Sequence, residues 1–172
     1  MMRKRPGLSA SLPRAAALAA ALGAQAVAAQ AACPIELAVY SEAGTGAGID
    51  FRPGTTAAVT NSFRMVLDRG VVLDGVVMWS QEPARPLGML MRDCPEGDVT
   101  GEELAACTVW EGVIYAVDAR GEVSPLPAQG TDAPRTLILA DLGRALRLSS
   151  VADAAGPPSA PGDVFALSGC QE

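Results

Sequence analysis

Apolar and polar residues alternate with a period of two along most of the chain after residue 33, a pattern that predicts β-strands. Residues 61–68 alternate most cleanly, and residues 71–79 repeat the pattern after a turn at 68–70. These two segments predict a β-hairpin. Gly75 lies inside the second segment, where it marks a bulge or, together with Asp74, an alternative tight turn.

Shorter apolar or β-branched segments account for the other expected strands, which are residues 35–41, 49–52, 87–92, 108–118, 123–126, 135–140 and 164–167. Helices are expected at only two places. Thr100 and Glu103 form a capping-box pattern that opens a helix of one or two turns ending near Cys107. Asp141 is expected to cap a second short helix through Leu148.

The elements therefore number about eight short strands and one or two short helices, without βα alternation or an internal repeat. The predicted fold class is mainly β (or α+β), an antiparallel sandwich or small barrel with helices as accessories. Residues 33–172 suit a single domain of this kind. Residues 152–162, which contain three prolines, are expected to form a mobile loop.

The first 32 residues have the three parts of a secretory signal peptide. Four basic residues precede an Ala- and Leu-rich segment at 15–29, and small residues follow it. We expect this leader to be removed and the product to be periplasmic or secreted. A lipoprotein anchored through Cys33 is the alternative, because that cysteine directly follows the small residues.

Four cysteines remain after the leader, an even set that predicts two disulfides in an oxidising compartment. Of the three pairings, we expect Cys94–Cys107, which closes a short loop, and Cys33–Cys170, which joins the two ends of the domain. No pair has the C-x-x-C spacing of a redox site.

Charge and composition exclude several function classes. All 19 acidic residues follow the leader together with only nine basic ones, all arginines, which gives residues 33–172 a formal charge of −10. Such a chain is a poor ligand for nucleic acid. The absence of histidine, and of lysine after the leader, removes Ser-His-Asp, Cys-His, Ser-Lys and Schiff-base chemistry. Carboxylate chemistry is what remains for an enzyme.

Few residues stand out as candidate sites. Trp79 and Trp110 lie near strand ends, beside Arg85 and Arg92. They would either form the floor of a carbohydrate- or peptide-binding groove or complete the core. Glu111 is a candidate acid if its side chain points inward, although a strand end usually exposes it. We expect no cofactor.

Two loops invite a ligand-binding interpretation. Asp93, Glu96 and Asp98 form an acidic loop that would suit Ca²⁺, but without the spacing of an EF-hand. Residues 44–48 read G-x-G-x-G, which resembles a phosphate-binding loop but lacks the final x-x-G and is followed by Pro53 instead of a helix. We interpret both as structural loops.

The sequence predicts an exported, non-enzymatic domain that binds another envelope protein or a small ligand. The alternatives are a carboxylate-dependent hydrolase of envelope polymers and a Ca²⁺-stabilised module.

Overall fold

The computed structural model describes residues 33–54, 56, 58–155 and 160–172, and everything below refers to this part of the chain. The leader expected at residues 1–32 lies outside it, as does the middle of the expected loop at 152–162.

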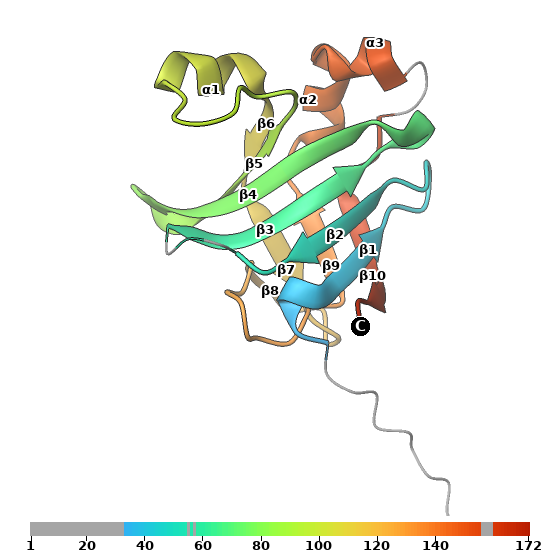
Figure 1. The fold of residues 1–172 in the computed structure, drawn as a ribbon. Coiled ribbons are helices and arrows are strands. Elements are labelled where there is room, and N and C mark those ends of the chain that lie inside the picture. The colour runs from blue at the N-terminus through green and yellow to red at the C-terminus, as the bar shows by residue number, and fades with distance from the viewer. Residues whose placement is uncertain (1–32, 55, 57, 156–159) are drawn as a thin grey trace, which may run out of the picture. The chain divides into compact units, whose positions relative to one another are not determined.

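The described residues contain ten antiparallel strands in one curled sheet, which confirms the predicted mainly β class (Figure 1). They are β1 (Ala38–Ser41), β2 (Gly48–Arg52), β3 (Val59–Val66), β4 (Val72–Gln81), β5 (Ala84–Met91), β6 (Thr108–Gly112), β7 (Ile114–Val117), β8 (Val123–Pro125), β9 (Thr136–Leu139) and β10 (Val164–Cys170). Their order across the sheet is β6-β5-β4-β3-β2-β1-β10-β9-β7-β8.

The curl follows from the single segment that we expected as one strand at residues 108–118. The segment bends at Val113, so that its first half, β6, pairs with β5 and its second half, β7, pairs with β9. One continuous piece of chain thus joins strands that are far apart in the sheet order. The result is a half-barrel in which β1–β5 face β7, β9 and β10 (Figure 1).

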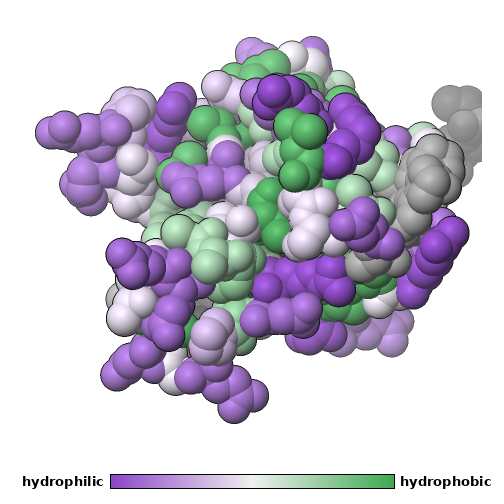
Figure 2. Space-filling view, turned by 90° about the horizontal axis from the view of Figure 1, so that it is seen from above, coloured by the Kyte–Doolittle hydropathy of each residue, from purple (hydrophilic) through white to green (hydrophobic). Residues whose placement is uncertain are grey.

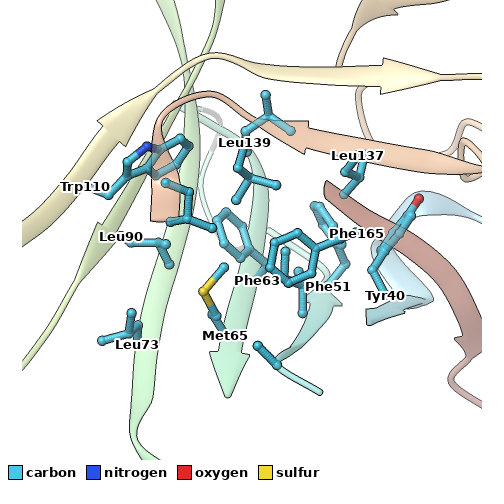
Figure 3. Packing of buried hydrophobic residues seen from close by; sticks show 14 of the residues in the cluster. Tyr40, Phe51, Phe63, Met65, Leu73, Leu90, Trp110, Leu137, Leu139 and Phe165 are labelled. Carbon is cyan, nitrogen blue, oxygen red and sulfur yellow. The ribbon is translucent and has the colours of Figure 1, made fainter. Parts of the chain in front are cut away.

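Inward-facing side chains from both sides of the half-barrel fill its interior (Figure 3). Phe51 lies between two aromatic neighbours, with ring-centroid distances of 5.8 Å to Tyr40 and 5.4 Å to Phe63. The Tyr40 hydroxyl donates a hydrogen bond of 2.9 Å to the Pro134 carbonyl, and burial raises the pKa of this hydroxyl.

Gly75 is neither a bulge nor a turn residue. It pairs with Phe63 in the middle of β4, and a Cβ there would overlap the Phe63 ring. Glycine is needed at this position because the ring occupies the space of the missing side chain. The expected turn at residues 68–70 is present as a 3₁₀ turn, η2 (Asp68–Gly70).

The other helical elements are η1 (Ile35–Leu37), α1 (Gly101–Cys107), α2 (Leu142–Leu148) and α3 (Val151–Ala155). Two of them correct the sequence-based expectations. Residues 35–37 form a 3₁₀ turn, closed by a 2.9 Å bond from the Leu37 N–H to the Pro34 carbonyl, so the first strand begins only at Ala38. The segment expected as a loop from residue 152 begins instead inside α3.

Both predicted disulfides are present. Cys33–Cys170 joins the start of the described chain to the end of β10, with a Cα–Cα distance of 5.8 Å. Cys94–Cys107 closes the loop that contains α1, with a Cα–Cα distance of 5.2 Å. No helix in the described ranges is long and apolar enough to cross a membrane.

Candidate functional site

A groove of about 520 Å³ lies between α1, β6 and α2. Its α1 wall is made by Gly101, Leu104 and Ala105, its floor by Met89 and Thr108–Glu111, and its α2 wall by Asp141, Arg144 and Ala145. Figure 2 views the molecule from the side on which the helices lie and shows apolar surface exposed among hydrophilic residues. The lining combines apolar residues with three charged ones.

The α1 wall is fixed by local chemistry. Thr100 and Glu103 make the predicted capping box, with the Thr100 N–H donating to Glu103 Oε2 at 2.8 Å and the Glu103 N–H donating to Thr100 Oγ1 at 3.3 Å. The hydrogen bonds from Thr100 lower the pKa of Glu103. No side chain of α1 is buried, so the cap and the Cys94–Cys107 disulfide are the main features that hold this helix in place.

The floor of the groove is β6, which is the last strand at one end of the sheet. Trp110 faces the core and is only 3% exposed. Its Nε1 donates a hydrogen bond of 2.9 Å to the carbonyl oxygen of Ala140, the residue that follows β9. This bond ties the floor of the groove to the segment that leads into α2.

The α2 wall corrects the predicted helix cap. Asp141 occupies the N-cap position, but it has a left-handed backbone conformation with φ of 60° and makes no capping bond through its side chain. Asp163 takes that role, because its Oδ1 accepts a 2.8 Å hydrogen bond from the Gly143 N–H. The Asp141 carboxylate is exposed at the groove as a result.

Three charged side chains line the groove, namely Glu111, Asp141 and Arg144. All three are exposed. None of them belongs to an ion pair found among the described residues. Their charges are therefore available to a ligand.

The residues that we singled out from the sequence do not form one site. Trp79 pairs with Pro86 and Trp110 with Leu90, which separates the tryptophans by four residues along β5, roughly 13 Å. Trp79 is 52% exposed near the end of β4, whereas Trp110 is part of the core. Trp110 thus completes the core, whereas a binding role for Trp79 stays a prediction.

The two candidate arginines are separated in the same way. Arg85 pairs with Ser80 beside Trp79. Arg92 lies just past the other end of β5, where its N–H donates to the Cys107 carbonyl at 2.9 Å and its Nε lies 3.1 Å from Asp93 Oδ2. Of the four candidates, only Trp110 lines the groove.

The acidic loop is exposed at Asp93, Glu96 and Asp98. Within the described ranges, no three Asp, Glu or Cys side chains are grouped closely enough to hold a metal ion. Glu111 points outward and is exposed, on the opposite face from Trp110 and Ile114.

The glycine-rich turn at residues 44–48 is occupied by the protein's own carboxylate. Glu42 accepts hydrogen bonds from the Gly44 N–H at 2.9 Å and from the Thr45 N–H at 2.7 Å. The Thr45 hydroxyl donates a third, of 2.8 Å. The amide groups that would have to bind a phosphate are thus already used by Glu42.

The α2 side of the groove was missed in the sequence. Residues 141–145 reach residues 101–111 only because the sheet curls at Val113, and no local pattern reports that contact. No protein family, curated protein or solved structure matches the chain.

Proposed function

We propose that residues 33–172 form an exported, non-enzymatic binding domain that holds another envelope protein or a small ligand in the groove between α1, β6 and α2. The observation that carries this proposal is the groove itself, which combines a mixed polar and apolar lining with three charged side chains free of ion pairs among the described residues. The walls are braced by a disulfide, a capping box and the Trp110–Ala140 bond. A site held in advance loses less entropy on binding.

Export is supported by the leader pattern and by the two disulfides, which persist in oxidising compartments. The Cys33–Cys170 bond favours a soluble product over a lipoprotein. A sulfur atom engaged in that bond is unavailable for a thioether to lipid.

The test measures whether the protein keeps a bound molecule when a bulky side chain fills the groove. Ala105 and Ala106 are neighbouring exposed residues of α1, but only Ala105 lines the groove. An A105W variant would fill the groove, whereas A106W adds the same side chain outside it. Native mass spectra of both variants, purified from the envelope fraction without reductant, should show a bound molecule with A106W and its loss with A105W. Equal occupancy in both variants would contradict the proposal.

A carboxylate-dependent hydrolase is the second candidate, and one observation favours it. Glu111 and Asp141 line the same groove, and glycoside hydrolysis requires two carboxylates across a cleft. The test is release of reducing ends from purified envelope glycans by the wild-type protein and by E111Q and D141N. Activity that both substitutions abolish would establish the hydrolase, and no release by the wild type would exclude it for these substrates.

A further inference from the structure

We propose that the groove accepts an extended, positively charged segment of another exported protein, which adds to the sheet as a strand along β6. This inference rests on the proposed binding function and specifies the chemistry of the partner. It follows from the edge of the sheet that the groove exposes, from the two helices that flank this edge and from the charges around it.

Four consecutive residues at the start of β6, Thr108–Glu111, line the groove. The register between β6 and β5 shifts at Val109, which has no partner on β5, whereas Trp110, Glu111 and Gly112 pair with β5 in regular register. β6 has a strand partner on one side alone, and the structure gives Val109, Trp110 and Glu111 no backbone hydrogen bond outside that pairing among the described residues. An extended peptide in the groove would pair with this outer edge.

The other end of the sheet is protected in a way that β6 is not. That end is β8, which has only three residues and includes Pro125, with Pro127 shortly after it. Short edge strands and prolines prevent edge-to-edge pairing. β6 has five residues and no proline, and its one irregularity, at Val109, leaves Trp110–Gly112 in regular register with β5. These three residues form the edge that is suited to pairing.

The flanking helices select a single strand over a second copy of this domain. A second copy that paired through its own β6 would bring its own α1 and α2 against the same two helices. An isolated extended segment carries no such flanking elements, and neighbouring strands need a separation of only about 4.8 Å. The occupant is therefore a peptide segment, not the sheet edge of a dimer.

The charges favour a basic segment. Glu111 and Asp141 place two carboxylates along the groove against one cation, Arg144. Glu102 adds another exposed carboxylate in the first turn of α1, and residues 33–172 as a whole carry a formal charge of −10. Complementary charge speeds encounter and excludes acidic competitors. The partner should alternate apolar and basic residues, the pattern of a strand with one face toward the groove.

The probe is a pool of acetylated, amidated octapeptides with Val, Ile or Leu at odd positions and Arg or Lys at even positions. A second pool carries Glu in place of the basic residues. Titration of the oxidised, isotope-labelled mature protein, followed by amide NMR, should show that the basic pool binds and perturbs residues 108–112. Hydrogen exchange of amides on the outer edge of β6 should slow, because they gain partners.

Backbone pairing has a signature that charge alone does not produce. Peptides from the bound pool are prepared with every odd or every even amide N-methylated. Alternate amides of a strand point the same way, so one version should lose binding at least tenfold and the other should retain it. Equal binding of both versions would overturn strand addition, while leaving the groove as a binding site.

Two protein variants test the charges. E111R should weaken the basic pool about tenfold. E96R, a matched reversal at an exposed residue that does not line the groove, should change its affinity less than twofold at about 0.15 M salt, where solvent and ions screen exposed charges. Binding of the acidic pool as tight as the basic pool would overturn the assigned charge. No binding of either pool up to about 1 mM would overturn the inference. The proposed function fails separately, if occupancy is the same in A105W and A106W.

Discussion

The indole of Trp110 donates a hydrogen bond from Nε1 to the carbonyl oxygen of Ala140 at 2.9 Å, across 30 residues of sequence. The same ring packs where side chains of Gly88 and Gly112 would otherwise be, since a Cβ at these positions would lie 3.0 and 2.7 Å from its atoms. One buried side chain thus fastens the bend between β6 and β7 to the segment that begins α2. Both the curl of the sheet and the position of the groove depend on it.

Replacing Trp110 by Phe should destabilise the protein by about 1–3 kcal/mol, because it removes the donor to Ala140 and leaves part of the ring volume empty. The matched control is W79F. Because Trp79 is 52% exposed, this substitution should lower the free energy of unfolding by no more than about 0.5 kcal/mol. Urea unfolding of the oxidised proteins measures both. Equal losses in the two variants would mean that the Trp110 contacts do not hold the fold.

Most strands were predictable from sequence because a local pattern indicates them, either alternation of side chains between a core and a solvent face or a short apolar or β-branched segment. The bend at Val113 was not, because residues 108–118 look like one β-branched and aromatic strand, and the change of strand partner depends on the rest of the sheet. The role of Gly75 was missed for a similar reason. Its requirement comes from the ring of Phe63 on the neighbouring strand.

The candidate site shows the same division. The capping box of α1 was predicted, since residue type and spacing define it. The two disulfides were predicted as one choice among three pairings, and the structure confirms that choice. The cap of α2 was assigned to the adjacent Asp141, whereas Asp163, 20 residues away, provides it. The groove itself depends on two helices brought together by the curled sheet, which is a property of the tertiary structure.

The two disulfides should contribute unequally to stability. In the chain-entropy model, removing Cys33–Cys170, with a sequence separation of 137, should cost about 5 kcal/mol, and removing Cys94–Cys107, with a separation of 13, about 3 kcal/mol. The comparison is between C33S/C170S and C94S/C107S in urea unfolding. An equal or reversed order would contradict the expectation.

Removal of Cys94–Cys107, although it should cost less stability, should loosen the α1 wall of the groove more than removal of Cys33–Cys170 does. Because α1 buries none of its side chains, C94S/C107S should speed hydrogen exchange of the α1 amides selectively. In C33S/C170S these amides should exchange at the rate expected from the global loss of stability alone. Protection of α1 that is unchanged in C94S/C107S would show that the capping box is enough to hold this wall.

Glu42 should make stability depend on pH in the acid range. Burial acts to raise its pKa, but the hydrogen bonds from Gly44, Thr45 and Gly162 together outweigh burial and lower it. A lowered pKa in the folded state means that the stabilisation is complete above the ordinary value of 4.5 and is lost as the pH falls through the folded-state value. E42Q should therefore cost about 1 kcal/mol near pH 7, and this difference should shrink below about pH 4.5.

Urea midpoints of the wild type and E42Q at intervals between about pH 3 and pH 7 measure this effect. E96Q serves as the control for loss of a carboxylate charge, because Glu96 is exposed in a loop. A constant difference between wild type and E42Q across this range would show that the turn does not depend on the ionised carboxylate.

The same substitution, Gly to Ala, should have opposite effects at two positions. At Gly75 the new methyl group would overlap the Phe63 ring in the middle of the sheet, so G75A should destabilise the protein by about 1–3 kcal/mol. At Gly101, in the first turn of α1, no atom lies within 4 Å of the new Cβ and the backbone is in a conformation open to alanine. G101A should stabilise by about 0.4–1 kcal/mol, because alanine restricts the unfolded chain. Thermal and urea unfolding measure the stability of both variants relative to the wild type. A G75A protein as stable as the wild type would show that Phe63 has room to move.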